Sequence, residues 1–248
     1  PGSTSETLVR DADAAMYQAK EVGRHRVVLY DESIGARTNN RLGMTTELRR
    51  AIAHGGLTMA AQPIVELSTG AVHAYEVLVR WRHAGREIDP AEFVMRATEL
   101  DIAGALDRWV LDEACRVMRG LRDSTGAQAG WLHVNATGTT LVDPLFASDV
   151  LRVLTSHRLD PSALCLEIVE DRLGGANDDA LETLNVLRRA GVRVAIDDFG
   201  TGHSSLSRLR ALPADTVKLD QSFVRDIATD RPSQAIAGSV IALARELG

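Results

Sequence analysis

The sequence predicts an α/β protein built around a mostly parallel sheet. From residue 57 onward, short apolar runs that suit strands alternate with amphipathic stretches that suit helices. The first two strand-like runs are separated only by Ser68, Thr69 and Gly70, so they are expected to pair as an antiparallel hairpin. The four later runs each follow a helical stretch and are expected to be parallel. Because the strands are short and apolar on both faces, a barrel of eight βα units is the expected closed form.

The predicted elements follow one another in a regular order. The strand-like runs are residues 58–67, 71–81, 131–137, 163–170, 193–199 and 216–223. Helical stretches lie between the later runs, at residues 105–121, 144–159, 178–191 and 204–212. A final helix is expected at residues 231–248. These runs account for six of the eight strands of such a barrel, so two strands are expected to be missing from this chain.

The N-terminal part has a different pattern. Residues 10–20 carry apolar side chains at helical spacing, and residues 25–31 predict a short strand. Residues 34–46 have no clean periodicity and are interpreted as a linker. A domain boundary is therefore expected between Ser33 and Asn40, with a separate domain over residues 47–248.

The composition excludes several classes of protein. With 45% apolar and 25% charged residues in 248, the chain resembles ordinary globular proteins, and no run approaches the roughly 20 apolar residues that a membrane span needs. The net charge of −6 argues against a DNA-binding surface. Cys115 and Cys165 lie in apolar periodic stretches, so we expect two core cysteines, no disulfide and a reducing, cytoplasmic compartment. Membrane contact by this fragment is not expected.

Six polar residues lie in or at the end of otherwise apolar strands. They are Glu76, Asn135, Glu167, Asp197, Asp198 and Lys218. A single one of them can be a helix cap or a satisfied polar residue, but burying several carboxylates together is unfavourable unless they bind something. Asn135 and Glu167 are 32 residues apart, and Glu167 and Asp197 are 30 apart, about one βα unit each. They are therefore expected at equivalent places on the C-terminal rim, where such folds carry their chemistry.

The residue types at this rim indicate a metal site. Oxygen ligands without cysteine or paired histidine favour Mg²⁺ or Mn²⁺. The adjacent Asp197 and Asp198 suggest two ions, which would activate a water and stabilise a phosphoryl transition state. Lys218 adds a cation that could orient that water or a phosphate, or could form a salt bridge to a rim carboxylate.

Several strings of the sequence resemble one known family. QPIVELSTGAVHAYEVLVRW, HVNAT, LEIVED, DDFGTGHSSL and KLDQSFV, in this order, resemble the EAL-domain family of bacterial cyclic di-GMP phosphodiesterases. The resemblance covers about Glu47 to Gly248. Residues 1–33 resemble the closing helix and strand of a GGDEF (diguanylate cyclase) domain, with Pro1 to Ser5 interpreted as a cloning remnant.

This resemblance implies a (β/α)₈-like barrel of EAL type, with its first strand antiparallel, and assigns roles to the rim residues. The implied metal ligands are Glu76, Asn135, Glu167, Asp197 and Asp198. Lys218 would hold the attacking water, so that Lys218, Glu76 and Asp197 form the catalytic set. Gln62 and Arg80 would contact the dinucleotide, with Asp220 as a weaker candidate, and Glu170 would anchor the loop after Asp198.

The sequence departs from the family pattern at three places. The name-giving Glu-Ala-Leu is Glu76-Val77-Leu78, which keeps the carboxylate and changes only packing. Met95, Thr98 and Asp101 stand where the family usually has Pro, Glu and Gly, over the ligand groove. Two further family strands, one with a glutamate assigned as a metal ligand or base, would lie beyond Gly248.

The function implied by the resemblance is a metal-dependent phosphodiesterase that opens cyclic di-GMP to linear pGpG in bacterial second-messenger signalling. The alternative is a catalytically inactive receptor that binds cyclic di-GMP in the same groove. The intact ligand set favours the enzyme, because receptors of this family commonly lose several ligands. Two partners are also implied: an upstream GGDEF domain in the parent protein, whose sensory or membrane segments would lie outside this chain, and a second copy in a homodimer. A role as a scaffold has no sequence feature of its own.

Overall fold

The computed structural model describes residues 4–21, 27–31, 44–125, 130–169, 178–200 and 211–247. The chain divides into two compact units. The smaller contains Pro1–Gly56 with Arg82–Arg86, and the larger contains Leu57–Trp81 with Glu87–Gly248. The expected boundary between Ser33 and Asn40 lies outside the described residues.

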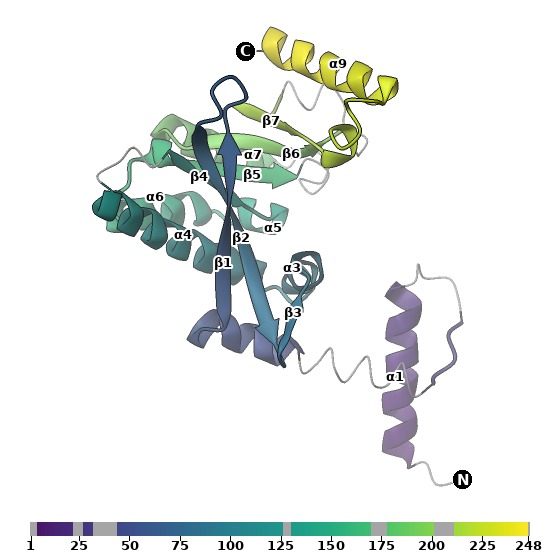
Figure 1. The fold of residues 1–248 in the computed structure, drawn as a ribbon. Helices are drawn as coiled ribbons and strands as arrows, with labels where there is room; N and C mark the ends of the chain where they lie inside the picture. Colours follow the sequence, from purple (N-terminus) through teal and green to yellow (C-terminus); the bar gives the residue numbers. More distant parts are fainter. Residues whose placement is uncertain are drawn as a thin grey trace. The chain divides into compact units, whose positions relative to one another are not determined.

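The larger unit is organised by one sheet, which is seven-stranded over the described residues (Figure 1). Its strands are β1 Leu57–Val65, β2 Val72–His83, β3 Arg86–Ile88, β4 Trp131–Asn135, β5 Leu164–Val169, β6 Arg193–Phe199 and β7 Thr216–Leu219. The order is β1-β2-β4-β5-β6-β7, with the short β3 beside β2. β1 is antiparallel to β2, while β4, β5, β6 and β7 follow in parallel. The predicted hairpin and parallel succession are confirmed.

Helices connect the strands as expected for βα units. They are α3 Pro90–Glu99, α4 Ala103–Thr125, α5 Gly138–Leu141, α6 Phe146–Ser156, α7 Asp178–Ala190 and α9 Arg231–Leu247. α4 packs on β4, α7 packs on β6, and α6 lies between α4 and α7 (Figure 1). With helices along the sheet, β5 is buried from Leu164 to Ile168, as a strand covered on both faces should be. α9 packs against β7.

The sheet curls strongly. In a flat sheet β2 and β7 would be about 19 Å apart, because they are four strand spacings from each other. Yet the Nζ atom of Lys218 on β7 lies 3.1 Å from Oε2 of Glu76 on β2. The sheet therefore bends around a common interior, as the predicted barrel requires.

Several element boundaries differ from the sequence prediction. β3 and α3 were not among the predicted elements; α3 begins after Asp89, whose side chain accepts a hydrogen bond from the Ala91 N–H, and Pro90 occupies the first turn. β7 ends at Leu219 rather than running to residue 223. The carboxylate of Asp220 caps a 3₁₀ turn at Gln221–Phe223, which ends the strand. The predicted helix at 204–212 lies almost entirely outside the described residues.

The smaller unit contains the helix α1, Ser5–Glu21, and a second helix at residues 44–54. The strand predicted for residues 25–31 is wrong for its described part, because residues 27–31 are not in a strand. A strand needs a hydrogen-bonded neighbour, and no described strand pairs with this segment. Val27 and Leu29 are accordingly 91% and 84% exposed. None of the described helices combines the length and apolarity needed to cross a membrane.

Both cysteines are core residues, as predicted. Cys115 on α4 and Cys165 on β5 are fully buried, with free thiols. Burial raises the pKa of each thiol to about 12, so neither is poised to react.

Candidate functional site

Three carboxylates from three strands converge on one point of the barrel interior. Glu76 lies on β2, Glu167 on β5 and Asp197 on β6, and one oxygen from each lies within 4.8 Å of the others. The register places all three on one face of the sheet, staggered along it: Glu76 pairs with His133, two residues before Asn135, which pairs with Glu167. Glu167 in turn pairs with Ala195, two residues before Asp197. These three residues, called the carboxylate cluster below, are drawn from strands far apart in sequence.

Lys218 supplies the cluster with a positive charge. Its Nζ atom lies 2.6 Å from Oε1 of Glu167 and 3.1 Å both from Oε2 of Glu76 and from Oδ1 of Asp197. The ammonium group therefore contacts all three carboxylates. The alternative role considered for Lys218 was a salt bridge to one rim carboxylate. In this structure Lys218 forms such a salt bridge with each of the three.

The electrostatics of the cluster follow from burial and like charge. Burial, and then the negative charge of Glu167, raise the pKa of Glu76 above its ordinary value. Burial also raises the pKa of Glu167, but the hydrogen bond from His133 and the charge of Lys218 outweigh it and lower that pKa overall. Burial lowers the pKa of Lys218, yet the surrounding carboxylates raise it well above 10.5. One ammonium group does not balance three carboxylates.

Glu167 is the most deeply placed member of the cluster, with no exposed surface. Its Oε1 atom accepts hydrogen bonds from Nδ1 of His133 at 2.8 Å and from Nζ of Lys218. Its Oε2 atom is buried, and no group of the described residues donates a hydrogen bond to it. A buried carboxylate oxygen without a partner is costly, and a divalent cation would satisfy it. The residues present therefore fit a metal ion.

The two successive aspartates of β6 reach the same pocket because the strand is irregular. In a regular strand, neighbouring side chains point to opposite faces. The register with β7 shifts across Asp197 and Asp198, and Asp198 has a φ of 54°, in the left-handed region that aspartate tolerates. Gly200 follows with a φ of 103°, and a Cβ there would lie 2.8 Å from the ring of Phe223. The irregular end of β6 is thus built into the sequence DDFG.

A pocket of about 240 Å³ opens beside the cluster. Asn135, Asp197, Asp198 and Arg80 line it, together with apolar residues of β2, α3 and α4. Asn135 is exposed at the end of β4 and lies opposite Glu167 in the strand register. Arg80 forms an ion pair with Glu87 at 3.5 Å. Asp107 lines it as well, so an amide, a guanidinium and three carboxylates border one cavity with largely apolar walls, which suits a polar ligand with flat apolar parts.

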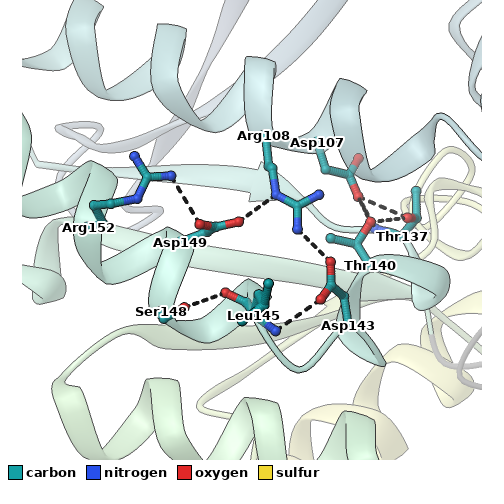
Figure 2. A network of polar contacts seen from close by, with 9 residues as sticks. All are labelled: Asp107, Arg108, Thr137, Thr140, Asp143, Leu145, Ser148, Asp149 and Arg152. Atoms are coloured by element: carbon teal, nitrogen blue, oxygen red, sulfur yellow. Dashed lines mark hydrogen bonds and ion pairs between the residues drawn. The ribbon is translucent and has the colours of Figure 1, made fainter.

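The turn after Asn135 is held by hydrogen bonds to Asp107 of α4. Figure 2 shows the buried carboxylate of Asp107, whose Oδ2 atom accepts from Thr137 N–H, from the Thr137 hydroxyl and, at 2.6 Å, from the Thr140 hydroxyl. Burial raises the pKa of Asp107, and these hydrogen bonds lower it in part. This contact secures the start of α5 and with it the end of β4.

The next residue of α4 holds the other end of this segment. Arg108 donates to Asp143 and, at 2.6 Å, to Asp149 on α6, and Arg152 also donates to Asp149 (Figure 2). These four residues, called the Arg108 cluster below, are half-buried or exposed at their side chains. The cluster ties α4 to α6 on the outer side of the sheet.

Three further residues that the sequence placed at the site are not members of the carboxylate cluster. Gln62 is exposed on β1, opposite Glu76 in the antiparallel register, and does not line the pocket. Asp220 accepts from the Ser222 N–H as the cap of its turn, and its carboxyl group interacts with that of Asp198. Glu170 is outside the described residues.

Three of the departures from the family pattern lie on α3 or just after it. Met95 and Thr98 of α3 line a shallow hollow together with Thr137 and Thr139. Asp101 has a φ of 56°, which explains why glycine suits this position and why aspartate is an acceptable replacement.

Sequence reasoning missed two residues of the site, His133 and Asp107. His133 lies two residues before Asn135, so strand alternation places both side chains on one face, and this signal was available. Asp107 gave a weaker signal, because a single acidic residue in an amphipathic helix is usually solvated.

The EAL domain family matches residues 45–248. The chain belongs to this family. The match spans every described strand of the sheet, and with them Glu76, Glu167 and Asp197.

Two curated relatives come from Pseudomonas aeruginosa. The bifunctional diguanylate cyclase/cyclic di-GMP phosphodiesterase MucR is 36% identical over 248 residues, covering 99% of this chain and 36% of the relative. The cyclic di-GMP phosphodiesterase NbdA is 36% identical over 247 residues, covering 99% and 31%. The chain thus spans about a third of the length of these relatives.

A solved structure supports the fold of the EAL domain. The PaMucR phosphodiesterase in complex with c-di-GMP superposes with a TM-score of 0.76 at 35% identity, covering 83% of each chain. The α/β architecture with an antiparallel first strand is therefore that of the family.

Proposed function

We propose that this EAL domain is a divalent-metal-dependent phosphodiesterase that hydrolyses cyclic di-GMP to linear pGpG. The observation that carries the proposal is Glu167, a fully buried carboxylate whose Oε2 atom has no partner among the described residues, inside a cluster of three carboxylates. The relatives named as cyclic di-GMP phosphodiesterases, and the PaMucR complex with c-di-GMP, support the substrate.

The cofactor is proposed to be Mg²⁺ or Mn²⁺, with two ions. Glu76, Glu167 and Asp197 would hold the first, and Asp198 and Asn135 at the pocket wall would complete the set. All of these side chains offer oxygen, the ligand that these cations prefer. A bound divalent cation would supply concentrated positive charge against the phosphodiester in the transition state.

The chain's own residues would bind and orient the substrate. Arg80 and Asn135 line the pocket of about 240 Å³, which is large enough for part of a dinucleotide. The guanidinium of Arg80 suits a phosphate or a base edge. Lys218, protonated and aimed at the cluster, would hold a water or a phosphate oxygen by donating a hydrogen bond from Nζ. Gln62, Asp220 and Glu170 keep their predicted roles as proposals.

The alternative is a receptor that binds cyclic di-GMP without cleaving it. One observation favours it: Lys218 contacts all three carboxylates, so the cluster already has a cation of its own. In a receptor, this ion-pair arrangement would persist when the dinucleotide binds.

The test is to incubate the chain with cyclic di-GMP and Mg²⁺ or Mn²⁺ and to measure linear pGpG by chromatography. Glu167→Gln serves as the site variant and Glu113→Gln as the matched control, because Glu113 pairs with Arg116 on its own helix, α4, and is not a member of the carboxylate cluster. If the domain is a phosphodiesterase, the wild type and the control should form linear pGpG, and Glu167→Gln should form none. Binding without product in all three would select the receptor.

The parent protein has further proposed features. Residues 1–33 are proposed to be the tail of a GGDEF domain, in keeping with the greater length of the relatives and with the cyclase activity in the name of MucR. A homodimer through the EAL domain and a cytoplasmic location stay predictions.

A further inference from the structure

His133 is buried in the barrel interior on the strand that ends at Asn135. Its side chain is 7% exposed, and Trp131, His133 and Asn135 share one face of β4 by strand alternation. A histidine in such a place fills space, but both of its ring nitrogens also have defined partners. Those partners determine where its proton lies.

The tautomer of His133 follows from its neighbour Trp131. The Nε1 atom of Trp131 donates to Nε2 of His133 at 3.0 Å. An indole nitrogen can only donate, so Nε2 must accept and carries no hydrogen. The hydrogen of the neutral imidazole is then on Nδ1, which lies 2.8 Å from Oε1 of Glu167. His133 therefore donates to Glu167.

Trp131 is itself held in place from two sides. The guanidinium carbon of Arg193 lies 4.0 Å from the centre of a Trp131 ring, and Nη1 of Arg193 donates to the carbonyl of Ser162 at 2.9 Å. The ring of His73 meets Trp131 edge-on at 3.9 Å between ring centres. Trp131 thus presents its N–H to His133 in a defined direction.

The hydrogen bond from His133 determines which oxygen of Glu167 is available. Oε1 accepts from both His133 and Lys218, whereas Oε2 has no donor among the described residues. Rotation of the carboxylate away from this orientation would break the bond to Nδ1 and turn the other oxygen away from its present direction. His133 therefore opposes that rotation in a way that Lys218, whose ammonium contacts three carboxylates, does not.

We propose that His133 is a positioning residue for the metal site: with its tautomer set by Trp131, it donates from Nδ1 to Glu167 and keeps the other carboxylate oxygen available to a divalent cation. This inference rests on the proposed metal-dependent function. Hydrogen bonds to ligating carboxylates commonly change metal affinity by about 10- to 100-fold. A residue that only filled space would have no such effect.

The test compares two substitutions that both remove the imidazole. In His133→Asn the amide nitrogen replaces Nδ1 as a donor, while His133→Leu fills similar space without a donor. Mn²⁺ affinity of the full chain, measured without substrate by electron paramagnetic resonance, should fall at least about tenfold in His133→Leu and stay near wild type in His133→Asn. Melting temperatures of the metal-free proteins check that both fold.

A third variant keeps the inference falsifiable if His133→Leu does not fold. Trp131→Phe keeps an aromatic ring but removes the N–H that sets the tautomer. Nitrogen-15 NMR of labelled histidine should show His133 protonated on Nδ1 in the wild type and a mixture of tautomers in Trp131→Phe, with weaker Mn²⁺ binding. An Nε2-protonated wild type would overturn the inference, as would Trp131→Phe with unchanged tautomer and Mn²⁺ affinity.

The outcomes separate this inference from the proposed function. If the wild type binds Mn²⁺ and the His133→Leu and His133→Asn variants bind it equally well, only the role of His133 is contradicted. If the wild type binds no Mn²⁺, the proposed metal site is contradicted, and the inference falls with it.

Discussion

The carboxylate cluster and the Arg108 cluster are both built from acidic side chains around a cation, yet they differ in charge balance and burial. In the first, the carboxylates of Glu76, Glu167 and Asp197 share the single ammonium of Lys218, and Glu167 has no exposed surface. In the second, Arg108 and Arg152 neutralise Asp143 and Asp149, and none of these four side chains is fully buried. Only the first has a deficit of positive charge where solvent cannot supply it.

This difference separates a binding site from a structural contact. A balanced, half-exposed cluster contributes modestly to stability and has no need of a ligand. An unbalanced, buried cluster is unfavourable alone, and its charge deficit is what a divalent cation would remove. Charge balance and burial together, rather than the number of acidic residues, therefore identify the site.

The largest expected effect comes from removing a charge at the buried cluster. Glu167→Gln or Asp197→Asn should abolish turnover of cyclic di-GMP, a loss of at least about 100-fold in kcat, because a charged ligand is gone. The fold should remain intact, since removing one of several like charges relieves repulsion. Rates are measured with metal limiting, and circular dichroism checks the fold. A near-normal rate in either variant would contradict the interpretation of the carboxylate cluster as a metal-binding site.

The second effect comes from removing the cation of the same cluster. Lys218→Met leaves three carboxylates without a cation and should lower the free energy of unfolding by about 2–3 kcal/mol, less than for a fully buried pair because the Lys218 side chain is 24% exposed. Mn²⁺ should then raise the melting temperature of the variant more than that of the wild type. Calorimetry with and without Mn²⁺ measures both, and a variant as stable as wild type without metal contradicts the prediction.

A third prediction changes an uncharged neighbour of the cluster. Val77 on β2 is 6% exposed and lines the pocket beside Glu76. Val77→Ala restores the family's Glu-Ala-Leu and should change activity less than tenfold, about 1.4 kcal/mol. Removing two buried methyl groups should lower the free energy of unfolding by about 1.5 kcal/mol. A large gain in kcat would instead mean that valine holds the domain in a receptor-like state.

The smallest effect is expected at the Arg108 cluster. Arg108→Met should reduce stability slightly and leave Mn²⁺ affinity and kcat unchanged, because the cluster lies on the outer helices. The hydrogen bond from Arg108 lowers the pKa of Asp149, and those from Leu145 N–H and Arg108 lower that of Asp143. Carboxyl groups with lowered pKa stabilise the fold above their ordinary value of 3.8 and lose this contribution as the pH falls below it. The stability difference between wild type and variant should therefore vanish on acidification, as urea titrations at several pH values would measure. A difference that persists at acidic pH would contradict this account.

Much of the fold follows from local pattern. The three-residue gap at Ser68 to Gly70 predicted the antiparallel hairpin, and the alternation of apolar runs with helical stretches predicted the parallel succession from β4 to β7. β3 was not predicted because it has only three residues, too few to show the two-residue period of a strand. α3, which follows it, was not predicted either. The strand predicted at residues 25–31 failed over residues 27–31, because an apolar run forms a strand only where a neighbour pairs with it.

The sequence by itself determined which residue types stand at the strand ends, since strand alternation and βα spacing are properties of the chain alone. It therefore indicated Glu76, Glu167 and Asp197 as companions. Only the tertiary structure decided their partners, because the curl of the sheet brings β7 within reach of β2 and so places Lys218 among all three. The same curl closes the interior around His133 and Glu167. Contacts between strands far apart in sequence depend on the curvature of the sheet, and this curvature cannot be predicted from any short stretch of sequence.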